Sequence, residues 1–165
     1  MPTAADLVRR QLVEMLDAKG AHMPFEPAVA DFPAEGLNRR VPNGVYTPWH
    51  LLEHIRFAQA DILDYIRNPS YLAPTWPDSY WPPRDAQASP ADLGATIEAF
   101  RRDRAALRAI VADPATDLFA VIPGTPGHTI LRQVRIVSAH NAYHLGEFAI
   151  LRQVMGTWPQ GREET

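Results

Sequence analysis

Sixteen prolines divide this 165-residue chain into segments, and their positions constrain the fold more than any other feature. Proline breaks the interior of a helix but is well placed in its first turn. At Thr47-Pro48 and Ser89-Pro90, a side chain that can cap a helix directly precedes proline, which indicates two helix starts. The other prolines cluster between segments of periodic apolar residues, so they separate helices rather than interrupt them.

The segments between the prolines have the apolar spacing that is typical of amphipathic helices. We predict helices over 3–18, 24–32, 47–67, 89–112 and 128–155, with Gly20 and Gly156 as stops for the first and the last. Residues 33–46, 68–88 and 113–128 are predicted connections, and Val121-Ile122 is the only strand-like fragment. The sequence therefore predicts an all-α protein, a four-helix bundle with long loops, built as one domain over residues 1–165.

Composition narrows the classes of function. The formal net charge is −3 and no basic helix or patch is apparent, which argues against a nucleic-acid partner. No apolar run reaches the roughly 18 residues that a membrane helix needs, and the N-terminus lacks a signal-peptide pattern, so we expect a cytoplasmic protein without a membrane partner. The chain has no cysteine. A metal ion would therefore need nitrogen and oxygen ligands, and thiol chemistry would need a co-substrate thiol.

Four of the six histidines form two pairs spaced four residues apart, His50/His54 and His140/His144. On a helix this spacing places both rings on one face, about 6 Å apart along the axis. Imidazole is a favoured ligand of divalent transition metals, so two such faces turned toward each other would bind an ion. Alternatively, each histidine lies at the rim of the bundle, with one ring nitrogen bonded to a carboxylate and the other in water.

The last predicted helix favours the first alternative. Its apolar stripe is interrupted by four polar residues, Gln133, His140, His144 and Glu147. Burying such groups is costly unless they are hydrogen-bonded or ligate an ion. Metal binding accounts for the histidines of both helices at once.

Three segments resemble a known family: YTPWHLLEHIRFAQADILDYIRNP, YLAPTWPDSYWPP and HNAYHLGEFAILRQVMGTWP. In this order they are similar to the DinB/YfiT superfamily, in particular its DinB-like branch, and HNAYHLGE is the most specific piece. The resemblance implies a four-helix bundle, often dimeric, in which three histidines hold a divalent metal. Carried over to this sequence, the ligands are His54 of the second long helix and His140 and His144 of the last, whereas the family does not generally require His50.

Further residues are predicted around these ligands. Glu147, one turn beyond His144, is the candidate catalytic carboxylate: it could orient an imidazole or move a proton, or only form an ion pair with Arg152. Asp61 could support a ligand or be solvated. Residues expected to contact a ligand or line the pocket are His50, Asp61, Gln133 and Tyr143.

Two groups of side chains remain open to more than one interpretation. The aromatic and proline residues of 76–83 could pin this connection onto the bundle or roof the site. Three arginines, Arg56, Arg135 and Arg152, are candidates for binding a carboxylate substrate, on the ground of charge alone.

A second motif overlaps the first histidine pair. His50, Glu53 and His54 match H-x-x-E-H, the inverted zinc-protease signature in which both histidines bind zinc and the glutamate is the base. The pattern is short, no later helix supplies an evident third glutamate ligand, and it would leave His140 and His144 unexplained. We therefore favour the three-histidine site.

The resemblance points to a small-molecule reaction, because the superfamily includes metal-dependent transferases and isomerases that use mycothiol, bacillithiol or glutathione. The leading hypothesis is a homodimeric enzyme whose zinc or nickel ion activates a low-molecular-weight thiol for S-transfer to a small molecule. A hydrolase that uses metal-activated water is the second hypothesis. A non-enzymatic, metal-binding stress-response module is the third.

Overall fold

The computed structural model describes residues 1–159, which are all-helical, as the sequence predicts. The elements are α1 (Ala4–Leu16), α2 (Phe25–Val29), η1 (Ala34–Gly36), α3 (Pro48–Arg67), η2 (Asp78–Tyr80), α4 (Pro90–Ala112) and α5 (Ile130–Met155), where η denotes a short 3₁₀ helix. Within the described residues, the only β-type pairing is an isolated bridge between Val121 and Thr129. None of the helices in this range is both long and apolar enough to span a membrane.

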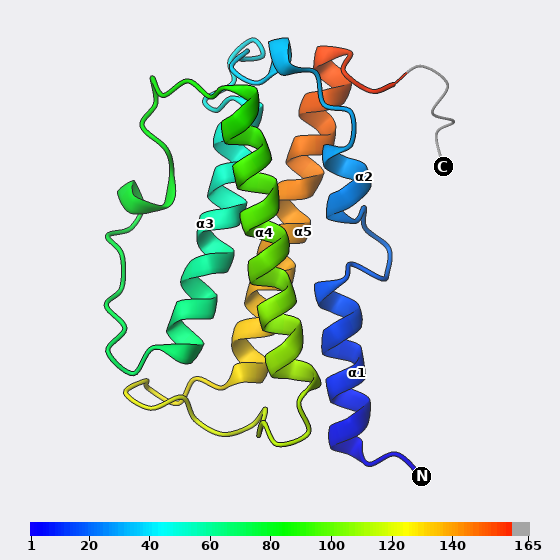
Figure 1. The fold of residues 1–165 in the computed structure, drawn as a ribbon, viewed down its shortest axis with the longest axis vertical. Helices are drawn as coiled ribbons and strands as arrows, with labels where there is room; N and C mark the ends of the chain where they lie inside the picture. Colours follow the sequence, from blue (N-terminus) through cyan, green and yellow to red (C-terminus); the bar gives the residue numbers. More distant parts are fainter. Residues whose placement is uncertain (160–165) are drawn as a thin grey trace.

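The four long helices lie along the same axis (Figure 1). Helices α4 and α5 each pack against α1 and against α3, so the arrangement is a four-helix bundle. Helices α3 and α4 run in the same direction (Figure 1), and the chain must return the length of the bundle between them. The proline-rich connection of residues 68–89 makes this return beside α3, which η2 contacts.

The predicted helix starts are confirmed in atomic detail. The hydroxyls of Thr47 and Ser89 accept hydrogen bonds from the backbone N–H groups three residues on, at 3.2 Å in each case, and proline occupies the first turn of both helices. Gly156 ends α5 in the left-handed conformation, with φ 64°. The predicted helix over 24–32 is too long at its end, because Ala30 leaves helical geometry and Asp31 has φ 52°.

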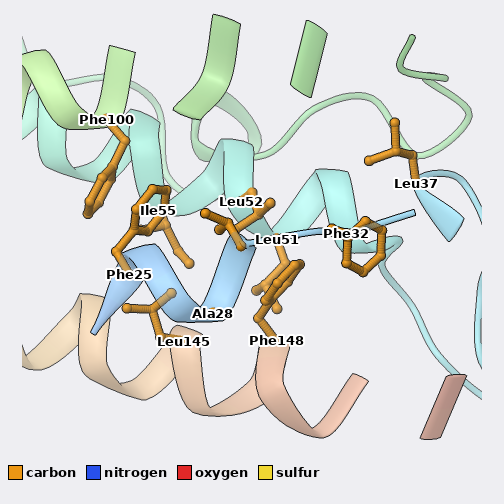
Figure 2. Close-up of a cluster of buried hydrophobic side chains, with 11 residues drawn as sticks. Phe25, Ala28, Phe32, Leu37, Leu51, Leu52, Ile55, Phe100, Leu145 and Phe148 are labelled. Atoms are coloured by element: carbon orange, nitrogen blue, oxygen red, sulfur yellow. The ribbon is translucent and has the colours of Figure 1, made fainter. Parts of the chain in front are cut away.

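Two apolar clusters hold the bundle together. One joins α2, α3, α4 and α5, with Phe25 stacked on Phe100 at 3.9 Å between ring centroids (Figure 2). The other joins α1, α4 and α5 through buried residues such as Leu107 and Val134. Along α5, Val137 belongs to the second cluster and Leu145 to the first, so His140 and His144 lie between the two.

Arg152 corrects an expectation from the sequence. It is completely buried, and its guanidinium donates hydrogen bonds to the carbonyl oxygens of Ala28, Ala30 and Thr157 at 2.7–2.8 Å. The same group lies over the ring of Phe32. Arg152 is therefore a structural cation that ties the end of α5 to the C-terminal end of α2, and neither a surface partner of Glu147 nor an accessible substrate ligand.

Candidate metal centre

Three histidines from two helices converge at the middle of the bundle. His54 comes from α3, and His140 and His144 come from α5; one ring nitrogen of each lies within 4.8 Å of the others. The His54 Nε2 atom is 3.0 Å from His140 Nε2 and 3.1 Å from His144 Nε2. Over residues 1–159 this is the only group of three or more histidine, cysteine or acidic side chains placed so that it could hold a metal ion.

The hydrogen bonds of two of the rings fix which nitrogen is free to ligate. His54 Nδ1 lies 2.8 Å from the carbonyl oxygen of Tyr80, and His144 Nδ1 lies 2.7 Å from Glu147 Oε2. Both partners are acceptors, so each Nδ1 carries the proton and donates. In the neutral rings the Nε2 lone pairs therefore face each other at 3.1 Å, which is unfavourable unless a cation lies between them.

This arrangement fits a divalent metal. Two nitrogens bound to a tetrahedral zinc ion at about 2.0–2.1 Å lie roughly 3.3 Å apart, close to the separations here. Metal-binding histidines commonly donate their other ring N–H to a carboxylate or a backbone carbonyl, as His144 and His54 do here. The donor set of three imidazoles suits zinc, nickel, copper or iron.

The protein environment favours the neutral form of two of the imidazoles, His140 and His54. Burial, with a further contribution from the neighbouring His144 and His54, lowers the pKa of His140 to about 4. Burial also lowers the pKa of His54, which is 1% exposed, although the Tyr80 carbonyl opposes this effect. Both rings are therefore in the form that ligates a metal at neutral pH.

The returning connection of residues 68–89 covers the centre with an aromatic stack. The Trp81 ring lies on the His54 ring with centroids 3.7 Å apart and planes 3° apart, and Tyr46 lies on Trp81 at 3.8 Å. The connection is thus pinned onto the bundle by its rings, and one of these rings covers a predicted ligand. Sequence reasoning did not find Tyr46 or the Tyr80 carbonyl as parts of the site; the density of aromatic and proline residues in 76–83 was the only signal.

Asp61 anchors this connection and is not a solvated residue. Its two carboxylate oxygens accept hydrogen bonds from the hydroxyls of Tyr71 and Tyr80, at 2.8 and 2.7 Å. Burial and the Asp61 carboxylate raise the pKa of Tyr80 to about 12, and the pKa of Tyr71 is raised as well. Asp61 therefore acts on His54 indirectly, by holding the residue whose carbonyl orients the ring.

The other predicted residues divide between the site and the scaffold. Tyr143 is exposed at the rim of the site and lies edge-on to His144, with ring centroids 4.8 Å apart. A hydrogen bond to Glu147 raises the pKa of the Tyr143 hydroxyl. Gln133 is buried, but it precedes His140 by about 10 Å along the helix axis and accepts a hydrogen bond from Arg132. The prediction that Gln133 lines the pocket finds no support in this placement.

His50 has a different task from His54. Its Nδ1 accepts a hydrogen bond from the Thr47 N–H at 3.2 Å, while the Thr47 hydroxyl accepts one from the His50 N–H, so His50 closes the capping box of α3. It does not belong to the group of histidines that could hold a metal. The pair His50/His54 thus contributes one ligand, His54, in agreement with the favoured three-histidine site.

The inverted zinc-protease motif is not assembled. The Glu53 carboxylate accepts hydrogen bonds from the Arg56 guanidinium and, at 2.8 Å, from the Thr96 hydroxyl of α4. Glu53 is therefore engaged between α3 and α4, and Arg56 is occupied by it rather than presented to a substrate. Arg135 is exposed on α5.

Fold and site together define a class of protein: an all-helical bundle with a three-histidine centre between two of its helices. A sequence model of the DinB superfamily matches residues 19–148, a range that includes His54, His140 and His144. The chain belongs to the DinB superfamily. Neither a search of curated proteins nor a search of solved structures gave a match.

Proposed function

We propose that this chain is a metal-dependent enzyme that joins a low-molecular-weight thiol to a small electrophilic substrate, with His54, His140 and His144 holding a zinc or nickel ion. The observation that carries the proposal is the convergence of these three imidazoles without a fourth ligand grouped with them in residues 1–159. Catalytic metal sites typically use three protein ligands, whereas structural zinc sites use four. When bound, such an ion lowers the pKa of a thiol or a water molecule at its open position.

The surrounding residues have distinct tasks in this proposal. Glu147 orients His144 through the hydrogen bond to Nδ1, and with its side chain 42% exposed it exchanges protons with solvent. Trp81 shields one face of His54 from water. In the reaction, the thiol sulfur forms a bond to an electrophilic carbon, and the leaving group departs with the electrons of the bond that breaks.

The sequence is compatible with a thiol as the nucleophile. The chain has no cysteine, so no protein thiol competes for the ion. The superfamily resemblance supports the same choice. Hydrolysis by activated water is the alternative chemistry, and the experiment below distinguishes the two.

The test begins with the metal content of the purified protein, measured by mass spectrometry, for the wild type and for His140→Ala, His50→Ala and Glu53→Gln. We expect only His140→Ala to lose the ion; retained metal in that variant would overturn the site. Thiol consumption with an electrophile is then compared in wild type and His54→Ala. Metal-dependent thiol consumption supports the proposal, ester turnover without thiol supports a hydrolase, and tight metal without any turnover supports a non-enzymatic module.

We also propose that the protein works as a homodimer in the cytoplasm. The resemblance to the DinB-like branch supports the dimer, and the absence of cysteine fits a reducing compartment. Sedimentation velocity would test the first proposal, and fractionation of the source cells the second.

A further inference from the structure

An apolar groove lies beside the residues that surround the metal centre, and the proposed function assigns it no role so far. It lies between the 44–46 segment and α5 and has a volume of about 380 Å³. Its walls are formed mainly by Val45, Tyr46, Leu51, Gly146, Ile150 and Leu151. We propose that this groove binds the uncharged, apolar part of the substrate, an alkyl or aromatic group; this rests on the proposed function.

Two contacts connect the groove to the centre. Glu147 lines the groove and is also the partner of His144 Nδ1, at 2.7 Å. On the opposite wall, Tyr46 stacks on Trp81, which in turn stacks on His54. A ligand in the groove would therefore lie against Glu147 and Tyr46, each of which is one side chain away from the metal-binding nitrogens.

The chemistry of the lining selects the ligand. Val45 and Ile150 are 47% and 60% exposed, so apolar side chains face water where a ligand would cover them. The single charged side chain in the lining is Glu147, whose carboxylate repels an anion. The volume lies within the usual range for small-molecule sites, about 300–1,000 Å³. A neutral, apolar group fits both the charge and the size.

A groove whose lining includes the hydrogen-bond partner of a predicted metal ligand favours a small molecule over a second copy of the chain. The same face of α5 does carry the exposed Val154 beyond Ile150, so a dimer interface is the competing explanation. Sedimentation velocity of the wild type and the variants below distinguishes the two.

Gly146 offers a way to fill the groove without touching the histidines. A Cβ atom added at this helical position would meet no atom within 4 Å. Gly146→Leu should place its side chain in the groove, and Gly94→Leu, at an equally open and exposed position of α4, is the matched control. Ile150→Gln is a second variant, which makes a wall polar without adding bulk.

The experiment measures binding to the zinc-loaded protein by NMR shift changes. The probes are benzyl mercaptan, its non-thiol analogue benzyl alcohol, and the anionic 2-mercaptoethanesulfonate. We expect both benzyl compounds to shift the groove resonances and benzyl mercaptan to bind at least tenfold more tightly than the anionic thiol. Gly146→Leu should weaken benzyl binding at least tenfold, Ile150→Gln should weaken it measurably, and Gly94→Leu should leave it unchanged, with zinc content equal throughout.

The outcomes separate this inference from the proposed function. Benzyl alcohol in the groove without any thiol turnover would support the groove and overturn the thiol chemistry. Thiol turnover that Gly146→Leu leaves unchanged would support the thiol chemistry and overturn the role of the groove. Absence of probe binding, together with a dimer that Gly146→Leu dissociates in sedimentation velocity, would make the groove an interface and overturn the inference.

Discussion

Glu147→Gln tests the link between the carboxylate and the proposed metal ligand His144. The amide oxygen of glutamine can still accept the hydrogen bond from His144 Nδ1–H, so the change removes a negative charge and leaves the geometry in place. We expect weaker metal binding, because a negatively charged partner makes the imidazole a more basic ligand.

The magnitude follows from the geometry and exposure of this pair. Removing a hydrogen-bond partner of a metal-binding histidine typically costs 10–100-fold in metal affinity. The bond is short, 2.7 Å, as charge-assisted bonds are, but the Glu147 side chain is 42% exposed, so solvent screens its charge. We therefore expect the lower end of the range, about tenfold, which corresponds to about 1.4 kcal/mol.

The assay is competition for zinc against a chromophoric chelator near pH 7.5. Glu14→Gln, at an exposed position of α1, removes the same charge far from the centre and should leave the zinc affinity unchanged. Unchanged zinc affinity in Glu147→Gln, with the fold intact by circular dichroism, would refute the reasoning that this carboxylate supports a ligand.

Three further predictions concern the surroundings of the centre. His54→Ala should lose zinc affinity more than 100-fold in the same competition assay, while His50→Ala should keep it and only lower the melting temperature, because His50 closes the capping box of α3. Asp61→Asn should lower the free energy of unfolding in urea by about 1–2 kcal/mol and weaken zinc binding several-fold, because Asp61 holds Tyr71 and Tyr80. The control Asp64→Asn should leave zinc affinity unchanged. Equal zinc affinity in the wild type and both variants would refute the anchoring role of Asp61. In metal-free protein, the pKa of His140 falls from 6.5 when unfolded to about 4 when folded. Protonation of His140 therefore does not affect the free energy of unfolding above pH 6.5, but it lowers this free energy by up to about 3 kcal/mol as the pH falls toward 4. Urea melts of the metal-free protein that show no such loss would contradict the prediction.

Much of the fold could be predicted because its signals are local. A capping hydroxyl followed by proline determines where α3 and α4 begin, since both groups act within one helical turn. The end of the second predicted helix was wrong, because the left-handed turn at Asp31 has no such marker in the sequence. The role predicted for Arg152 was also wrong. Two of its partners, the carbonyl oxygens of Ala28 and Ala30, lie more than 120 residues earlier in the chain, and the third is that of Thr157.

The candidate site could likewise be predicted from the sequence only in part. The spacing of His140 and His144 by itself places both rings on one face of a helix, and the superfamily resemblance pointed to His54 as the third ligand. Spacing alone could not say why His54 rather than His50 takes part. The structure gives the reason: the His50 ring is used by the cap of α3, whereas His54, one turn further on, faces α5.

The sequence thus determined the long helices, the starts of α3 and α4 and the residue types able to hold a metal, because these depend on neighbours within a few residues. Only the tertiary structure decided what surrounds the metal centre. Helices α3 and α4 run in the same direction, so the connection between them has to return along α3. That return brings the Tyr80 carbonyl and the Trp81 ring onto His54, from 26 and 27 residues away, and no local pattern specifies such a contact.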